Sequence, residues 1–409
     1  MFTIGMNVSI VDGSLNYRDV QPGDVLCLQA GERDNLKLIN LHGAPGKPII
    51  VRNAGGTVTI SGVTYLSGGI GIYASSYLRV TGTGTSQQCG AQVPANAQDC
   101  GIVINGTHKG IKIDTGTGSG DVSHIEIDHI AVSNISKYVK TRGISIHPLE
   151  KQVITNLYFH HNYVAHTLAE GFYIGSEPNE RPYASLGKIE NLDISYNLVE
   201  DTGYEGINVK VAVKNVQVHH NVVRRTGLSR TPTYQGGIKI AMSTGEVYNN
   251  YVEDSYEGIR STRPLENPGT TLYFNNIVIN ARNVAIETAE EGAQIFNNTV
   301  VWCGTAGIVG DVSNTVVFDN IIAGCDGQAL KGLDKARFSN LLGSVERIGF
   351  VDPEQNDFRL KSRSRAVDAG RYGNLFLSFD FADQPRPVGK HPDMGAFEYQ
   401  SWVSAVWQP

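Results

Sequence analysis

The chain has 409 residues, of which 41% are hydrophobic and 18% are charged, and its formal net charge is −6. These values exclude a disordered chain, and the absence of a basic block or a long apolar run argues against nucleic-acid binding and a membrane span. The 46 glycines and the many asparagines favour a turn-rich, all-β protein. An elongated repeat fold of this length can be a single domain, and we expect one domain over residues 1–409.

Residues 1–60 are predicted to form an N-terminal cap with the first strands. VQPGDVLCLQAG has the pattern of a turn before an apolar strand, and GKPIIVRNAGGTVTISG that of two short strands separated by Gly-Gly. Such a cap protects the open edge of a stack. No basic segment followed by an apolar run begins the sequence, so no signal peptide is predicted in it. Given the architecture described next, we still expect a secreted or periplasmic protein.

Residues 61–322 are predicted to form the rungs of a solenoid, because one phrase recurs. Two polar residues around an Asn precede β-branched residues, as in HHNYV, FNNIV and FNNTV, and the shortest spacing between copies is 22 residues. One Asn per copy indicates a repeat fold whose internal Asn ladder satisfies the turn amides. Short strands without helical crossovers then predict a right-handed parallel β-helix with two or three strands per rung. The aligned residues are Asn162, Asn197, Asn221, Asn250, Asn276, Asn298 and Asn320.

A second phrase recurs between Ala169 and Thr288, in the copies GFYI, GINV, GIKI, GIRS and AIET. Side chains alternate along a strand, so inward apolar residues place the third residue of each copy outward. Neighbouring strands lie about 4.8 Å apart, and these third residues are therefore predicted to form one outer column. Ser145 precedes the column and Val309 follows it, so we expect chargeable residues only in the middle of the array. The column comprises Tyr173, Asn208, Lys239, Arg260 and Glu287.

The five cysteines allow two candidate pairs. Cys89 and Cys100 flank a polar loop that a disulfide could close, although spacing alone does not establish pairing. Cys303 and Cys325 are about one rung apart, so they either bridge two rungs or lie in the core as thiols, and we favour thiols. Cys27 is predicted to be a core residue, and no Cys or His pattern indicates zinc.

Residues 323–409 are predicted to hold the terminal rungs and a closing segment. DFRLKSRSRAVDAGRYG and DQPRPVGKHPDMGAFEYQ resemble the C-terminal closing piece of secreted β-helix proteins. Together with the repeat phrases, they make most of the chain resemble the pectate-lyase-like superfamily of parallel β-helices. The resemblance implies export and a capped end. It leaves the function open, because the superfamily contains polysaccharide lyases, glycoside hydrolases, phage tailspikes and carbohydrate-binding proteins.

The middle third of the chain resembles the family of alginate lyases and chondroitinase B. Lys239 and Arg260 share the outward column and are 21 residues apart, which is one bare rung. The resemblance implies that Lys239 acts as a base and Arg260 as an acid, beside a calcium ion held by Asn and Glu residues. The implied calcium ligands are Glu170, Glu205, Asn208 and Glu257.

The residues also support this chemistry without the resemblance. β-Elimination from a uronate needs a cation near the substrate carboxylate, a base for the C5 proton and an acid for the leaving oxygen. Tyr173 is the alternative acid or base. A group of Lys and Arg residues on one face of an acidic protein predicts an anionic polysaccharide as the partner, and long loops could add Tyr rings for stacking. The predicted substrate-binding residues are Asn208, Lys210, His147, Arg181, Tyr183, Tyr234, Arg263 and Glu287.

Two other functions remain open beside the lyase, which we favour. A glycoside hydrolase on the same scaffold would use paired carboxylates among Glu205, Glu257 and Glu287. A non-catalytic β-helix would bind glycans or serve as structure, and then the column would be an ordinary solvated strand face, where ion pairs contribute only about 0–1 kcal/mol. The pairs His160–His161 and His219–His220 are not expected to bind metal, because alternate residues point to opposite sides.

Overall fold

The computed structural model describes residues 1–62, 68–84, 89, 100–107, 109–115, 122–133, 141–176, 182–231, 235–262, 269–310, 314–333, 337–371 and 377–401. The chain divides into two compact units, which we describe separately. Unit 1 spans residues 1–216 and 226–234, and unit 2 spans residues 217–225 and 235–409. No helix among the described residues is long and apolar enough to cross a bilayer.

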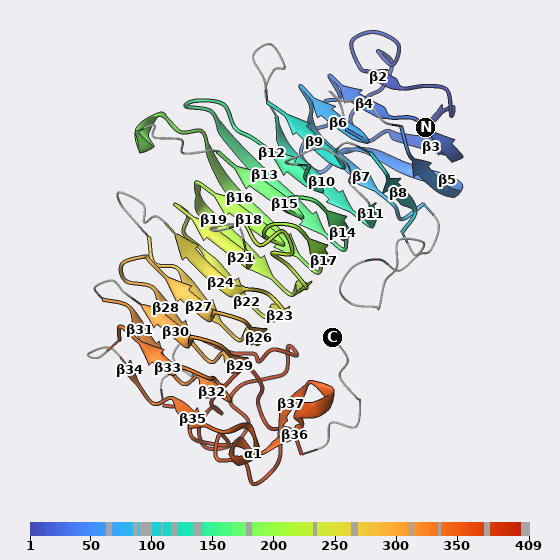
Figure 1. The fold of residues 1–409 in the computed structure, drawn as a ribbon. Coiled ribbons are helices and arrows are strands. Elements are labelled where there is room, and N and C mark those ends of the chain that lie inside the picture. Colours follow the sequence, from blue (N-terminus) through green and yellow to red (C-terminus); the bar gives the residue numbers. More distant parts are fainter. Residues whose placement is uncertain are drawn as a thin grey trace. The chain divides into compact units, whose positions relative to one another are not determined.

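Between residues 76 and 331, each rung contains three parallel strands among the described residues, and equivalent strands of successive rungs pair in sequence order (Figure 1). We call them the first, second and third strands of the rung. In the rungs before residue 76, Val25–Arg33 and Ile49–Ile60 each run as one strand through the first two strand positions. In unit 2, for example, β28, β29 and β30 form one rung, and they pair with β31, β32 and β33 of the next. This arrangement is the predicted right-handed parallel β-helix.

The strands of unit 1 have the following bounds. The first strands are β1 (Phe2–Ile4), β3 (Val25–Arg33), β5 (Ile49–Ile60), β7 (Ser76–Thr81), β10 (Ser123–Asp128), β13 (Val153–His160), β16 (Lys188–Ser195) and β19 (Ala212–His219), which continues into unit 2. The second strands are β8 (Ile102–Asn105), β11 (Ile130–Ser133), β14 (Tyr163–Thr167) and β17 (Leu198–Thr202). The third strands are β2 (Ile10–Asp12), β4 (Leu36–Ile39), β6 (Ile70–Tyr73), β9 (Ile111–Asp114), β12 (Ile144–Ile146), β15 (Phe172–Gly175) and β18 (Ile207–Lys210). A short 3-10 helix, η2, covers Tyr183–Ser185.

Unit 2 repeats the pattern and ends in a small antiparallel pair. Its first strands are β22 (Glu246–Tyr248), β25 (Leu272–Phe274), β28 (Gln294–Phe296), β31 (Val316–Phe318) and β34 (Arg337–Phe338). Its second strands are β20 (Val222–Arg224), β23 (Tyr251–Glu253), β26 (Ile277–Ala281), β29 (Thr299–Cys303), β32 (Ile321–Ala323) and β35 (Leu341–Gly343). Its third strands are β21 (Gly236–Ala241), β24 (Glu257–Thr262), β27 (Val284–Thr288), β30 (Ala306–Gly310) and β33 (Gln328–Lys331). Helix α1 (Val345–Ile348), β36 (Phe350–Asp352), the 3-10 helix η3 (Pro353–Gln355) and β37 (Asp357–Leu360) follow.

Inward apolar residues of the third strands fill the interior of each unit. In unit 2, Ile238, Ile259, Ile286 and Ile308 lie opposite one another in register, and each is fully buried. Burying one such side chain contributes about 1.5–3 kcal/mol, so a ladder of identical residues fixes the register of the stack. The predicted alternation of the phrase is therefore confirmed.

The predicted Asn ladder is present inside each unit. In unit 2, Asn276 and Asn298 each accept hydrogen bonds through their side-chain oxygen from the Asn one rung before, at 2.9–3.1 Å. The ladder extends to Asn340, which the sequence phrase did not include. The left-handed backbone belongs to the residue before each ladder Asn, as at Asn275 and Asn297, and not to the ladder residue. Two adjacent Asn residues thus have separate tasks, one inside the tube and one at its corner.

The C-terminal closing segment, residues 377–399, packs on the first strands of unit 2. Rings of successive first strands, such as Phe274, Phe296 and Phe318, stack at 4.9–5.4 Å, and Leu377 and Phe379 cover them. The corner amides Asn249, Asn275 and Asn297 donate to backbone carbonyls of the segment. Its charged residues are buried as well: Arg386 pairs with Glu398 at 2.9 Å with both side chains inaccessible. The residues that resembled a closing motif therefore hold the cap in place.

Both candidate cysteine pairs form disulfides. Cys89–Cys100 closes a loop, as one alternative predicted, and Cys27 is a buried thiol. The favoured prediction of free thiols at Cys303 and Cys325 was wrong. Cys303 ends β29 and Cys325 follows β32 in the next rung, so their Cα atoms lie 4.3 Å apart. A one-rung spacing that suits core stacking brings two thiols within bonding distance just as well.

Candidate functional site

The predicted outer column exists in both units. In unit 1, Lys112, Ser145, Tyr173 and Asn208 lie opposite one another on β9, β12, β15 and β18. In unit 2, the column runs from Lys239 on β21 through Arg260, Glu287 and Val309 to Lys331 on β33. The expectation that chargeable residues occur only in the middle of the array was wrong, because Lys112 and Lys331 extend the column beyond Ser145 and Val309. A polar column alone therefore does not identify a functional site. The contacts that its side chains make are needed to decide whether the column is one.

The column is less exposed than an open strand face. Tyr173 and Asn208 are 0% exposed and Lys239 is 8% exposed, although all three side chains point away from the tube interior. Arg260 and Glu287 keep 25% and 28% of their side chains accessible. Outward residues on neighbouring rungs cover one another and are desolvated, which strengthens every charge interaction among them.

The unit 1 cluster centres on Tyr173. Lys210 Nζ lies 3.0 Å from Tyr173 Oη and donates to it. The Arg142 guanidinium lies 3.8 Å from the ring centroid, and the His147 ring stacks on Tyr173 at 4.6 Å. Arg142 and Lys210 thus place two cations against one phenol, and cation–π attraction stabilises this arrangement. The predicted residues Tyr173, Lys210 and His147 come together as one cluster.

Arg142 is a member of this cluster that sequence reasoning missed. Its Nε donates to Glu170 at 3.0 Å, and its Nη1 lies 3.0 Å from His147 Nε2. A signal was available, because Arg142 directly precedes the glycine of GISI, just as Glu170 and Glu205 precede the glycines of their phrases. The residues before the glycines of GISI, GFYI, GINV and GIRS form a second set of polar side chains beside the column.

Asn208 has unusual surroundings for a buried amide. Its side chain is 0% exposed, and neither Nδ2 nor Oδ1 has a hydrogen-bond partner among the described residues. A buried amide left unpaired is destabilising by about 1–3 kcal/mol. The ladder residues Asn162 and Asn221, by contrast, donate through Nδ2 to the side-chain oxygen of the ladder Asn on the next rung, which makes Asn208 a candidate for binding a ligand.

The unit 2 cluster centres on Arg260. Its Nη1 donates to Glu257 at 2.8 Å, and Lys239 is its register partner on β21. Its Nε lies 2.9 Å from Glu287 without the geometry of a hydrogen bond, so this contact is an ion pair. Two carboxylates therefore flank one guanidinium, and Glu257 is hydrogen-bonded to it. An Arg side chain carries five N–H donors, and no described residue accepts a hydrogen bond from Arg260 Nη2.

The predicted calcium ligands do not fit one metal site. Glu170 binds Arg142 and Glu257 binds Arg260, so two of the four carboxylate or amide groups already neutralise a cation. Calcium needs six to eight oxygen ligands, typically with several free carboxylates. Glu205 is buried, and Asn208 Oδ1 is the predicted ligand atom whose lone pairs no described residue uses. We therefore derive no catalytic step through calcium at these residues.

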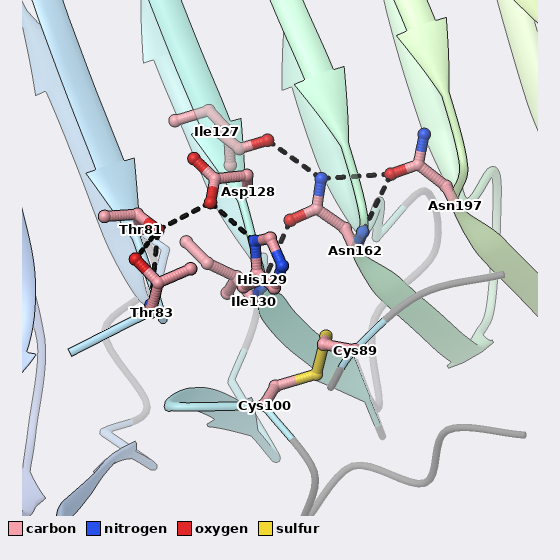
Figure 2. Close-up of a disulfide and its surroundings, with 10 residues drawn as sticks. All are labelled: Thr81, Thr83, Cys89, Cys100, Ile127, Asp128, His129, Ile130, Asn162 and Asn197. Atoms are coloured by element: carbon pink, nitrogen blue, oxygen red, sulfur yellow. Dashed lines mark hydrogen bonds and ion pairs between the residues drawn. A yellow bond between two sulfur atoms is a disulfide. The ribbon is translucent and has the colours of Figure 1, made fainter. Parts of the chain in front are cut away.

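A different group in unit 1 has ligand atoms close enough for a metal ion. One atom each of Glu126, Asp128 and His160 lies within 4.8 Å of the others. Arg79 Nε, however, lies 3.0 Å from Glu126 and 2.8 Å from Asp128 and neutralises both. Asp128 also accepts from Thr81 and contacts His129, as Figure 2 shows beside the Cys89–Cys100 disulfide and the Asn162–Asn197 ladder. These hydrogen bonds and the Arg79 guanidinium lower the pKa of Asp128 to about 2 against the opposing effect of burial.

Of the remaining predicted binding residues, the structure describes Tyr183. Tyr183, in η2, has the Lys188 ammonium 4.7 Å from its ring centroid, so its face is already occupied by a cation. Arg181, Tyr234 and Arg263 lie outside the described residues. Their predicted roles stay predictions.

Unit 2 also contains a buried acid that sequence reasoning did not single out. Glu290 is 2% exposed, accepts a hydrogen bond from Tyr273 Oη at 3.3 Å, and follows β27 by two residues. Burial raises the pKa of Glu290 to about 7 and that of Tyr273 well above its ordinary value. The sequence around Glu290, TAEEGA, has no pattern that predicts a buried carboxyl group.

Comparison with solved structures agrees with this architecture. The structure of pectate lyase Pel9A matches with a TM-score of 0.54 at 13% identity, over 98% of this chain and 96% of that one. A GH136 lacto-N-biosidase from Eubacterium ramulus matches with a TM-score of 0.51 at 15% identity, over 80% of this chain and 63% of that one. The chain therefore has the right-handed parallel β-helix fold of pectate-lyase-like proteins, as its repeat phrases predicted.

An alginate lyase from Paenibacillus sp. str. FPU-7 is also similar, with a TM-score of 0.49 at 15% identity over 83% of this chain and 97% of that one. No protein-family model and no curated protein sequence matches the chain. At these identities the similarity establishes the fold, and the activity must be argued from the residues.

Proposed function

We propose that the protein is a polysaccharide lyase that cleaves a uronate-containing, anionic polysaccharide by β-elimination. The observation that carries this proposal is the register pairing of Lys239 with Arg260 on β21 and β24, with Arg260 held by Glu257 and Glu287. The pair combines a base of the right chemistry with a cation whose orientation is fixed before substrate binds.

In the proposed reaction, the Lys239 amine takes the proton from C5 of the uronate. The C5–H electron pair forms the C4=C5 double bond, and the C4–O4 bond breaks. The leaving oxygen keeps its electron pair and takes a proton from solvent water, so that one chain ends in an unsaturated uronate and the other in a new reducing end. Arg260, with donors left at Nη2, faces the developing charge and stabilises it.

The Glu257 and Glu287 carboxylates have a positioning role in this scheme. Without them the guanidinium of Arg260 would be free to rotate in solvent, and its alignment with Lys239 would be lost. A misplacement of about 1 Å can reduce a rate by about a hundredfold.

The unit 1 cluster supports the same class of substrate. Lys210 adds a cation beside Tyr173, in a part of the column where Arg142 pairs with Glu170 and Lys112 pairs with Asp114, and a cation on this face of a chain of net charge −6 favours an anionic glycan. Tyr173, with Lys210 at its oxygen, is the alternative proton-transfer group. Two disulfides further support the proposal that the protein acts outside the cytoplasm, since such bonds persist in oxidising compartments.

Three variants test the proposal and separate the two possible bases. Lys239→Met keeps the length of the side chain and removes the amine, and we expect turnover to fall by about 10²–10⁴, the typical contribution of a general base. Tyr173→Phe removes only the phenol oxygen and is expected to retain most of the activity. Lys214→Met, at an exposed lysine 3.9 Å from Glu190, is the matched control.

The assay follows the ultraviolet absorbance of unsaturated uronate, and affinity electrophoresis on the same polysaccharide checks binding. Loss of activity in Tyr173→Phe with full activity in Lys239→Met would transfer the base to unit 1. Equal activity in all three variants would refute the proposed site. Parallel reactions with chelator test a metal requirement separately.

Glycoside hydrolysis is the second candidate, because Glu257 and Glu287 contact the same guanidinium. Two carboxylates held this close are compatible with the spacing of a hydrolase pair. Glu257→Gln and Glu287→Gln would abolish the release of saturated reducing ends if this candidate were correct.

A further inference from the structure

A cavity of about 380 Å³ lies at the corner between the second and third strands of unit 2. Ligand sites in proteins measure about 300–1,000 Å³, so this volume suits one or two sugar rings. The cavity lies beside the end of β26, the end of β29 and the turn after β32. It is lined by Asn280, Arg282, Trp302, Gly304, Gly324 and Asp326, none of which belongs to the predicted column.

The backbone is left-handed at one position of this corner in successive rungs, and Trp302 is the bulky aromatic residue at that position. The registers of β23, β26, β29 and β32 place Asp254, Asn280, Trp302 and Gly324 at equivalent positions of successive rungs. All four have positive φ, with 53° at Trp302. Asp, Asn and Gly tolerate this conformation, whereas a bulky aromatic residue rarely adopts it. Backbone strain of this kind concentrates at binding sites.

Glycines allow the chain to pack closely beside the indole. A Cβ on Gly304 would lie 2.2 Å from the Arg282 carbonyl oxygen, and one on Gly324 would lie 2.9 Å from Val345 and 3.0 Å from Trp302 Cδ1, so a larger residue would collide at either position. The edge of the indole packs against Phe358 with ring centroids 5.9 Å apart, while the side chain stays partly exposed. The Cys303–Cys325 disulfide joins two of the three rungs that line the cavity, so this part of the site is rigid before any ligand binds.

We propose that this cavity binds a pyranose ring of a neutral glycan, stacked on Trp302. The indole face carries negative charge density, which attracts the C–H groups on the apolar face of a sugar. Asn280 lies one rung away, about 4.8 Å along the stack. Its amide donates one N–H to Asp254 at 3.1 Å and can direct the other to a ring hydroxyl. The lining holds one carboxylate, Asp326, and one guanidinium, Arg282, so its formal charge is zero, which suits a neutral ring. The inference is independent of the lyase proposal.

Calorimetric titration with neutral hexasaccharides of xylose, glucose and mannose tests the proposal, with a galacturonate hexasaccharide as the anionic probe. Trp302→Asn puts a residue that favours positive φ at this corner, so the fold is kept while the platform is removed. We expect the wild type to bind at least one neutral probe more tightly than the anionic one. Affinity should fall about tenfold in Trp302→Asn, equivalent to about 1.4 kcal/mol, and recover in part in Trp302→Tyr.

Thermal unfolding of each variant confirms that it is folded, and the wild-type titration stands without any variant. Absence of binding to all neutral probes, or equal affinity in the wild type and Trp302→Asn, would overturn the proposal. Tighter binding of the galacturonate probe would overturn its charge assignment. None of these titrations involves turnover, so their failure and the failure of the lyase proposal are distinguishable.

Discussion

The two units place different side chains at the same left-handed corner of the rung. In unit 1 the corner holds His129, His161 and Tyr196, whose rings stack on one another at 5.0–5.1 Å. In unit 2 it holds polar residues that bond the closing segment or residue 371, including His220, Asn249, Asn275, Asn297 and Asp319. The backbone is equivalent in both units, but the contacts at the corner differ, because His161 stacks between rings in unit 1 whereas His220 contacts Asp383 of the closing segment in unit 2.

This difference separates what the repeat specifies from what each unit adds. The inward Asn ladder and the apolar core are common to both units and fold the rung. The corner residues vary, and an amide there can anchor a segment far away in sequence, whereas a ring extends a stack. The same logic applies to the outer column, where identical positions hold a fixed arginine in unit 2 and a buried phenol in unit 1.

The largest effect should follow from breaking the buried ion pair that holds the closing segment. Arg386→Met leaves Glu398 buried and unpaired and also removes a 3.0 Å hydrogen bond to Asn275. Loss of one partner of a buried pair typically destabilises by about 3–5 kcal/mol. Urea unfolding should show this loss, while the exposed control Lys214→Met should stay within about 0.5 kcal/mol. An unchanged midpoint in Arg386→Met would contradict the anchoring role.

Adjacent asparagines allow a sharper test of the inner and outer tasks. Asn298→Ala removes an inner amide that donates to Tyr273 and accepts from Asn276, so buried backbone and side-chain groups lose partners. We expect it to destabilise by about 1–3 kcal/mol. Asn297→Gly keeps the positive φ and loses mainly the bond to the Asp393 carbonyl, at about 1 kcal/mol or less. Equal losses in both variants would show that the two tasks are not separate.

The units should also respond to pH in opposite directions. In unit 2, burial and the neighbouring Glu398 carboxylate raise the pKa of Asp393 to about 7, and burial raises that of Glu290 to about 7. These folded groups retain protons that the unfolded chain loses above its ordinary carboxyl pKa. Their stabilising contribution is complete below pH ~4 and is lost as pH rises through 7.

In unit 1 the sign is reversed. Burial and the neighbouring His160 and His129 lower the pKa of His161 to about 4, so the unfolded chain binds the extra proton below its ordinary histidine pKa. Stability there falls as pH drops from ~6.5 to 4, and Asp128 adds a further loss as pH falls through 2. Hydrogen exchange at pH ~4.5 and 6.5, corrected for intrinsic rates, should show protection of β13 and β14 rising with pH and that of the closing segment falling. Glu290→Gln should weaken the unit 2 response, and parallel changes in both units would contradict the assignment.

The smallest effect is expected when the corner residue of unit 1 is exchanged for that of unit 2. His161→Asn gives up stacking with His129 and Tyr196, worth about 0.5–1.5 kcal/mol, but suits the positive φ better. The net change at neutral pH should be within about 0.5 kcal/mol. The variant should also lose the acid sensitivity of unit 1, measured by the same hydrogen exchange. A large loss of stability at neutral pH would mean that ring stacking contributes more to stability than the fit of the residue to the positive φ of the corner.

Sequence periodicity was sufficient to predict most of the fold. The Asn phrase and the GIxI phrases follow directly from a repeated backbone, so Asn298 in the ladder and Ile286 in the core could be predicted from spacing. The Cys303–Cys325 bond could not, because one-rung spacing fits stacked thiols and a disulfide equally. Asn340 was missed because its phrase, FSNLL, lacks the β-branched residues of the others.

The candidate site was only partly predictable. The strand register predicts which residues are neighbours, but it does not predict which of them form ion pairs. Spacing placed Lys239 beside Arg260, but not the two carboxylates on Arg260 or the Arg142 guanidinium on Tyr173. Those contacts depend on side-chain rotamers, which a sequence pattern does not specify. Trp302 carried no signal at all, since its positive φ arises from the corner of the rung and not from its own preference.

The central claim is that residues of the column catalyse β-elimination and not hydrolysis. Measuring two products of the same reaction tests this claim most directly. The wild-type protein is incubated with polygalacturonate, alginate, chondroitin sulfate, dermatan sulfate, heparin, hyaluronan and ulvan, and unsaturated uronate and new reducing ends are both measured. We predict that on one of these substrates the two rise together, one for one. New reducing ends without ultraviolet absorbance would establish hydrolysis and contradict the proposal. Absence of any product on all of these substrates would also contradict it.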